Sequence, residues 1–171
     1  MIKRTLGGVG LLTLMLALTS CHTATGGGWI VSPSDPDKKA HFAFSVNCDD
    51  VDGAAVVTGS LQYHDQAYTV TAENGNAKKL SIHGLVSGSF FPSTCEGLHQ
   101  SNESGGQYSG TYVPHPHTLG PGGTFVLRIE DLGQRGPSKG DFFAISLFGG
   151  VFDQYVNSGT LGGGQITVGS E

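Results

Sequence analysis

The stretch Phe125-Val126-Leu127-Arg128-Ile129-Glu130 (residues 125–130) contains the clearest structural pattern of the chain. Apolar residues at positions 125, 127 and 129 alternate with residues that include Arg128 and Glu130. Successive side chains of a β-strand point to opposite faces, so this order predicts a strand with one buried face and one face in water. Glu130 and Asp131 would then point in opposite directions, which does not suit acid–base catalysis across one bond.

The same alternation recurs along most of the chain. Its apolar positions are Ala40, Phe42, Phe44 and Val46, then Val57, Gly59, Leu61 and Tyr63, then Tyr68, Val70 and Ala72, and finally Phe143, Ile145 and Leu147. Weaker runs lie near residues 80–82, 85–91, 107–113 and 155–157, and many of the 28 glycines stand between runs. We therefore expect an all-β fold, either a single β-sandwich or a closed β-barrel of about nine to ten short antiparallel strands.

The run at residues 141–148 differs from the others. Phe142 and Phe148 place apolar side chains on its second face as well. A strand that is apolar on both faces is typical of the middle of a covered sheet, so this strand is expected to be central.

Two triglycines precede short β runs near the two ends of the chain, Gly26-Gly27-Gly28 and Gly162-Gly163-Gly164. Glycine allows two backbones to approach closely. One interpretation is that the first and last strands lie side by side. The alternative is two unrelated glycine hinges.

A family resemblance rests on five segments in series. They are Thr25–Ile30, Lys39–Phe44, Gly59–Asp65, Asp141–Leu147 and Leu161–Ile166. In this order they resemble the small post-COAP-type domain of secreted and surface bacterial proteins. The resemblance implies an all-β accessory domain and carries no catalytic residues. His41, Ala43 and Phe148 depart from the family pattern, and the two cysteines of the domain, Cys48 and Cys95, are not part of it.

The first 20 residues read as an export signal. Lys3 and Arg4 precede an apolar core that ends at Leu18, and this core is too short to span a bilayer as a helix. Leu18-Thr19-Ser20-Cys21 resembles the lipobox of bacterial lipoprotein precursors, which implies cleavage before Cys21 and attachment of diacylglycerol and further acyl chains, such as palmitate, to that residue. An ordinary secretory signal cleaved near Ser20 is the alternative.

The expected organisation is therefore a signal peptide (1–20), a membrane-proximal tether (21–25) and one domain (26–171). The lipid at Cys21 would hold the protein to a membrane of the bacterial cell envelope. Residue 22 is His22 and not the aspartate that commonly retains lipoproteins in the inner membrane, which favours the outer membrane in a cell that has two.

The domain contains two cysteines. Export would place Cys48 and Cys95 in an oxidising compartment, which predicts a disulfide between them, with two free thiols as the alternative.

Removal of Lys3 and Arg4 leaves seven basic residues against 14 acidic ones. An acidic chain of this kind argues against a nucleic-acid partner.

Three local clusters contain side chains that can bind a metal ion or take part in catalysis. His115-Pro116-His117 offers two imidazoles but no third metal ligand, so an exposed loop is the favoured interpretation. Residues 48–53 place three carboxylates before a glycine, but without the ligand order of an EF-hand, which favours an inter-strand turn. His64-Asp65 looks like a strand end before a turn. None of these clusters predicts a metal or cofactor site.

No catalytic residue is predicted either, because the chain lacks a G-x-S-x-G elbow, a P-loop and a dinucleotide fingerprint. The leading expectation is a lipid-anchored envelope protein with a non-catalytic structural or interaction domain. The alternative is a glycan-binding module facing cell-wall or exported polysaccharide. Its aromatic platform would comprise Trp29, Tyr63, Tyr108, Tyr112 and Phe148. A hydrolase with a non-sequential site is the third possibility.

Overall fold

The computed structural model describes residues 22–52, 54–72, 75–91, 104–132 and 140–170. Its strands are β1 (His22–Ser32), β2 (Asp35–Val51), β3 (Ala54–Thr71), β4 (Ala77–Phe91), β5 (Ser104–Pro114), β6 (Gly123–Asp131), β7 (Phe142–Phe148), β8 (Val156–Thr160) and β9 (Gly163–Ser170). Two 3₁₀ turns, η2 (His117–Leu119) and η3 (Gly150–Phe152), lie in the connections.

All nine strands belong to one antiparallel sheet. Their order is β8-β7-β6-β5-β4-β3-β2-β1-β9, so every strand from β1 to β8 lies beside its neighbour in sequence. This arrangement confirms the all-β expectation. Strands β2, β3 and β4 are longer than the short strands expected, at 17, 18 and 15 residues.

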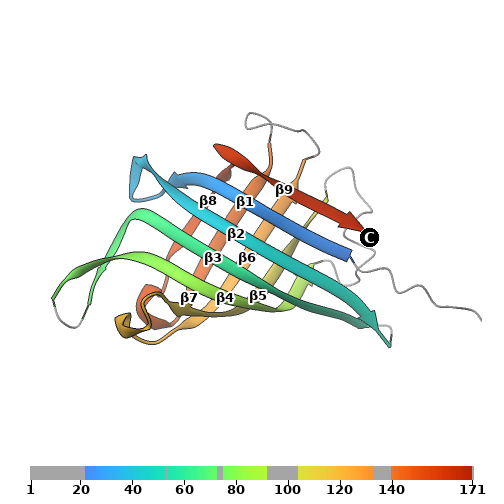
Figure 1. Ribbon diagram of the computed structural model, residues 1–171, viewed down its shortest axis with the longest axis horizontal. Helices are drawn as coiled ribbons and strands as arrows, with labels where there is room; N and C mark the ends of the chain where they lie inside the picture. Colours follow the sequence, from blue (N-terminus) through green and yellow to red (C-terminus); the bar gives the residue numbers. More distant parts are fainter. Residues whose placement is uncertain (1–21, 53, 73–74, 92–103, 133–139, 171) are drawn as a thin grey trace, which may run out of the picture.

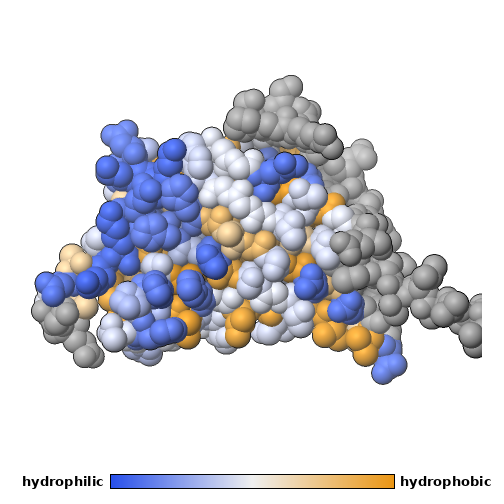
Figure 2. Space-filling view, viewed as in Figure 1, coloured by the Kyte–Doolittle hydropathy of each residue, from blue (hydrophilic) through white to orange (hydrophobic). Residues whose placement is uncertain are grey.

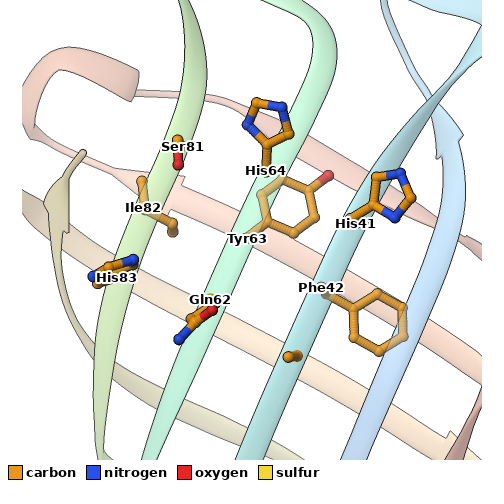
Figure 3. Close-up of a pocket in the computed structure, with 9 residues that line it drawn as sticks. His41, Phe42, Gln62, Tyr63, His64, Ser81, Ile82 and His83 are labelled. Atoms are coloured by element: carbon orange, nitrogen blue, oxygen red, sulfur yellow. The ribbon is translucent and has the colours of Figure 1, made fainter. Parts of the chain in front are cut away.

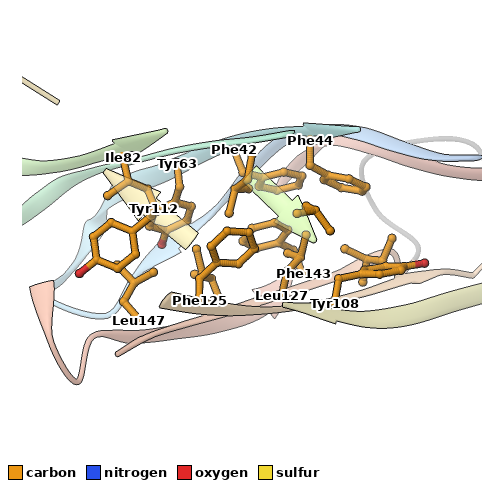
Figure 4. Packing of buried hydrophobic residues seen from close by; sticks show 14 of the residues in the cluster. Phe42, Phe44, Tyr63, Ile82, Tyr108, Tyr112, Phe125, Leu127, Phe143 and Leu147 are labelled. Carbon is orange, nitrogen blue, oxygen red and sulfur yellow. The ribbon is translucent and has the colours of Figure 1, made fainter. Parts of the chain in front are cut away.

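The sheet curls into two layers around one core. Figure 1 shows β6, β7 and β8 crossing behind β1, β2 and β3. The alternating residues of both layers point inward, and Figure 4 shows the two sets meeting, with Phe42 and Tyr63 on one side and Phe125 and Leu127 on the other. The Phe42 and Phe143 rings stack at 3.9 Å between centroids. Burying one such ring contributes about 2 kcal/mol of transfer free energy.

The inward positions are those that the alternation predicts. Phe125, Leu127 and Ile129 are fully buried, whereas Arg128 lies in water and pairs with Glu130 on the outer face. The expectation of a central strand at residues 141–148 is wrong. β7 lies next to the edge strand β8, and Phe148 on its second face is 49% exposed.

The first and last strands lie side by side, which confirms the interpretation of the two triglycines. β1 pairs with β9, and Gly28 lies opposite Gly164. A Cβ atom on Gly28 would come within 2.3 Å of the Gly163 carbonyl oxygen, and one on Gly164 within 2.1 Å of the Gly27 carbonyl oxygen. Only glycine permits this backbone spacing.

The outer edge of β9 is covered by carboxylates instead of by another strand. The Ile166 amide donates a hydrogen bond to Asp141 Oδ2 (2.8 Å), and the Val168 amide donates one to Asp131 Oδ2 (3.1 Å). Asp131 is the last residue of β6 and Asp141 directly precedes β7, so the two carboxylates join β9 to the second layer. The edge strand β9 is thereby tied to the ends of β6 and β7.

Strand β1 begins at His22, so four residues of the expected tether, 22–25, lie within the sheet. They pair with both β2 and β9, and Ala24 is buried. The expected signal peptide and Cys21 fall outside the described residues. Within the described residues, no helix is long and apolar enough to span a membrane.

Candidate functional site

A buried polar network lies where β1 and β3 meet β8. Asp65 is fully buried and accepts hydrogen bonds from the Tyr155 hydroxyl (2.6 Å) and the Ser32 hydroxyl (2.9 Å). Its other oxygen accepts the amides of Ala67 (2.7 Å) and Tyr68 (3.1 Å). Strand β3 continues past this point to Thr71, with a register shift between His64 and Thr69. Asp65 therefore lies at an irregularity inside the strand and not at the strand end before a turn that the sequence suggested.

The network continues through two further side chains. The Tyr63 and Tyr155 hydroxyls lie 2.7 Å apart, and Asn157 Nδ2 donates to the Tyr63 hydroxyl (2.8 Å) and to the Val31 carbonyl (3.1 Å). Burial by itself would raise the pKa of Asp65, but the four donors outweigh it and hold that pKa below its usual range. Burial raises the pKa of both Tyr63 and Tyr155. Donors therefore favour the charged form of Asp65, and burial favours the neutral forms of Tyr63 and Tyr155, which is the pattern of a structural network.

The outer face of the same region carries a second cluster, rich in histidine. Five of the seven histidines gather along β2 to β5 and the η2 turn: His41, His64, His83, His115 and His117. His41 pairs with Trp29 of β1 on one side and with His64 of β3 on the other. His64 pairs with Ser81 of β4, whose carbonyl accepts the His115 amide (2.8 Å). These residues form a lateral row across five strands.

A second row runs beside the first, two residues along each strand. It contains Gln62 of β3, His83 of β4 and Val113 of β5. The His83 and His115 rings stack at 5.1 Å between centroids, and Gln66 Nε2 lies 3.1 Å from His41 Nε2. We call His41, Gln62, His64, Ser81, His83 and His115 the histidine face.

The histidine face contains a shallow hollow of about 220 Å³. Figure 3 shows His41, His64 and His83 standing on three neighbouring strands around it, with Gln62 and Ser81 between them. The imidazole, amide and hydroxyl groups of this lining donate and accept hydrogen bonds, so the hollow offers partners to a polar ligand.

The charged side chains described beside the histidine face are positive. Lys39 and Lys79 flank the histidines on β2 and β4, and the Lys39 ammonium lies 4.0 Å from the centre of the Trp29 ring. No acidic residue occurs in residues 39–47, 58–64 or 79–87, the segments that form the face. Figure 2 shows hydrophilic residues gathered on the left of this side of the molecule, near the β1–β2 turn and the start of β2.

The structure places the histidine pair of residues 115–117 and the carboxylates of residues 49–52 at the ends of strands. His115 and His117 are exposed in a connection, as expected, and among the described residues no three His, Cys, Asp or Glu side chains are placed to hold a metal ion. Asp49 and Asp52 are exposed at the β2–β3 turn, where Asp52 has a φ of 53°, so the turn interpretation is confirmed. Cys48 is buried at an inward position of β2, and Cys95 lies outside the described residues, so their disulfide stays a prediction.

The expected aromatic platform is wrong in its composition. Tyr63, Tyr108 and Tyr112 are buried in the core and cannot contact a sugar. Trp29 is half-buried on β1, with Gly162 and Gly163 against its ring, whereas Phe148 is exposed on β7 of the other layer. The five aromatic residues do not share one face.

The histidine face was not predicted from the sequence, although part of its signal was present. His41, His64 and His83 each occupy an outward position in the alternation that predicts the strands. Their lateral alignment depends on the pairing register, which places His41 opposite His64. No family model, curated protein or solved structure matches the chain.

Proposed function

We propose that the protein is a lipid-anchored component of the bacterial cell envelope whose β-domain has a non-catalytic structural or interaction role. The lipobox-like residues 18–21 support the anchor, and the resemblance to the post-COAP-type domain supports an accessory role. Outer-membrane residence is part of the proposal for a cell with two membranes.

The observation that carries this proposal is that His22, the residue directly after Cys21, already belongs to the sheet. His22 pairs with Cys48 on one side and with Ser170 on the other, directly after Cys21 in the sequence. All nine described strands lie after Cys21, so cleavage at the proposed processing site would leave every one of them intact. Because one residue spans at most about 3.6 Å, an acylated Cys21 would hold this end of the sheet against the bilayer.

Metabolic labelling with radioactive palmitate tests the anchor. The full-length chain produced in a bacterium is expected to incorporate label and to remain in the membrane fraction after a high-salt wash. The Cys21→Ser variant is the matched control and should lose the label. An unlabelled protein with a bare Cys21 in its intact mass would overturn the anchor.

Glycan binding is the second candidate function. The histidine face favours it, because imidazole, amide and hydroxyl groups surround a shallow hollow on an outer sheet surface. The face also differs in charge from the chain as a whole, which carries 14 acidic residues against nine basic ones.

A further inference from the structure

We propose that the histidine face binds an acidic polysaccharide, whose sugars carry carboxylate groups, and binds it more tightly at pH 5.5 than at pH 7.5. The inference rests on the interaction role proposed above and names the ligand class of that role. It follows from the charge, the register and the chemistry of the face.

The charge of the histidine face complements that of an anionic ligand. Lys39 and Lys79 supply positive charge at neutral pH, and the Trp29 ring holds the Lys39 ammonium in place before any ligand arrives. The carboxylates nearest along β2 are Asp37, beyond Lys39, and Asp49, at the far end of the strand. In the part of the chain that the structure describes, an anion on the histidine face therefore meets cations and neutral donors and no facing carboxylate.

The extent of the face favours a polymer over a small ion. The first row passes from His41 through His64 and Ser81 to His115, which covers three strand spacings of about 4.8 Å each. Gln62 and His83 widen this strip on β3 and β4. The result is a strip of donors that runs across the strands, which suits an extended chain.

The donor types favour a carboxylated sugar over a phosphate polymer or a nucleic acid. Arginine is the residue that matches phosphate with two parallel hydrogen bonds, and no arginine occurs in the segments that form the face. Nucleobases need free aromatic rings for stacking, whereas Trp29 is packed against Gly162 and lies under Lys39. Amide and hydroxyl groups such as those of Gln62 and Ser81 are partners for sugar hydroxyls.

The pH dependence comes from the imidazoles. Histidine is the side chain whose charge ordinarily changes between pH 5 and 8. Among the described residues, the charged groups that face the row are Lys39 on β2 and Lys79 on β4. His117 of η2 is a further titratable group beside His115. The facing groups on β1, β3 and β5 are Trp29, Gln62, Gln66 and Val113, which are uncharged. Each proton taken up by His41, His64, His83 or His115 therefore adds positive charge to a face that is already cationic.

Titration calorimetry with polygalacturonate tests the proposal on the protein purified as the cell produces it. At constant ionic strength the dissociation constant is expected to be at least tenfold lower at pH 5.5 than at pH 7.5. Neutral dextran should not bind. The His41→Gln/His64→Gln double variant should reduce the tenfold ratio to less than threefold, because it removes the central pair of the row.

The matched control is Asn47→Gln/Thr58→Gln, which changes a directly opposed, exposed pair on the same two strands. This variant should keep the full pH ratio, and thermal melting of both variants should match that of the parent protein. Any of four results would overturn the proposal: no binding of polygalacturonate, equal affinity at the two pH values, tighter binding of polyphosphate, or binding that disappears with EDTA.

The test is independent of the lipid anchor. Cys21→Ser should bind polygalacturonate as the parent does. Loss of palmitate labelling with intact binding would overturn the anchor alone, and labelling without binding would overturn the ligand alone.

Discussion

At the scale of single residues, two buried tyrosines of the same core are expected to respond in opposite ways to one chemical change. Tyr155→Phe removes the hydroxyl that donates to Asp65 and contacts Tyr63, at a cost of about 2 kcal/mol. The Tyr108 hydroxyl is buried with no hydrogen-bond partner in the described part of the chain. Tyr108→Phe should therefore leave stability unchanged or raise it by about 1 kcal/mol.

Urea unfolding of the two variants measures both effects. Equal destabilisation by the two substitutions would contradict the assignment of the network to Tyr155 and of the unpaired hydroxyl to Tyr108. The comparison is sharp because both changes delete one oxygen and keep the ring.

Asp65 gives the protein a specific sensitivity to acid. Its pKa is lowered in the folded state, so the unfolded chain binds more protons than the folded chain in the range below its ordinary pKa of about 3.9. The stability that Asp65 contributes is complete above that value and is lost as the pH falls through the lower folded pKa. Asp65→Asn should be less stable than the parent at pH 7, and the difference should narrow towards pH 2 in urea unfolding.

The sequence predicts which residues are buried in the core better than it predicts which residues form the polar network. Inward positions such as Leu127 follow from alternation alone, because burial needs only the correct face. The role of Asp65 does not, because its donors come from Ser32 and Tyr155, which are distant in sequence. A buried carboxylate next to His64 in a polar stretch has the same local signature as an exposed turn.

At the scale of elements, the β1–β9 pair is expected to depend on particular glycines. Gly164 has a φ of 102°, and an added Cβ would meet the Gly27 carbonyl, so Gly164→Ala should cost about 2 kcal/mol or more. Gly169 of the same strand has nothing within 4 Å of an added Cβ. Gly169→Ala should change the free energy of unfolding by no more than about 0.5 kcal/mol. Thermal or urea unfolding of the two variants checks this contrast, and a similar loss in both would contradict the close approach of β1 and β9.

Strands could be predicted where apolar and polar residues alternate. The order of strands in the sheet was harder to predict, because it depends on tertiary packing. The triglycines suggested the contact between the first and last strands, because glycine allows close backbone approach, but two unrelated hinges would have given the same sequence pattern. The position of β7 was mispredicted, because Phe142 and Phe148 suggest cover on both faces. In the structure Phe142 lies beside the Arg128 guanidinium and Phe148 stays exposed, so an outer apolar residue on β7 requires no second layer.

At the scale of the whole molecule, the predicted Cys48–Cys95 disulfide would close a loop of about 46 residues and stabilise the fold by about 3 to 4 kcal/mol. Alkylation of the unfolded, unreduced Cys21→Ser variant should therefore find no free thiol. Adding Cys48→Ser should expose one thiol and lower the midpoint of urea unfolding. Two free thiols before that second substitution would contradict the pairing.

The fold class and the number of strands could be predicted from the sequence. Whether the sheet forms a sandwich or closes into a barrel could not. Alternation and glycine spacing indicate nine to ten antiparallel strands, and nine are present in the described residues. They do not distinguish a sandwich from a barrel, because both alternate in the same way. The choice depends on contacts such as that of Asp141 with the Ile166 amide, which joins residues 25 positions apart.

The strand order also has a consequence for biosynthesis. β1 is made before the other described strands and pairs with β2, but its second edge has no partner until β9, the last described strand, has been added. Until then that edge is a template for any extended segment nearby, including the last strand of another copy. Crowded nascent chains would therefore exchange their final strands, and a product truncated before Gly163 would aggregate instead of remaining a loosened monomer.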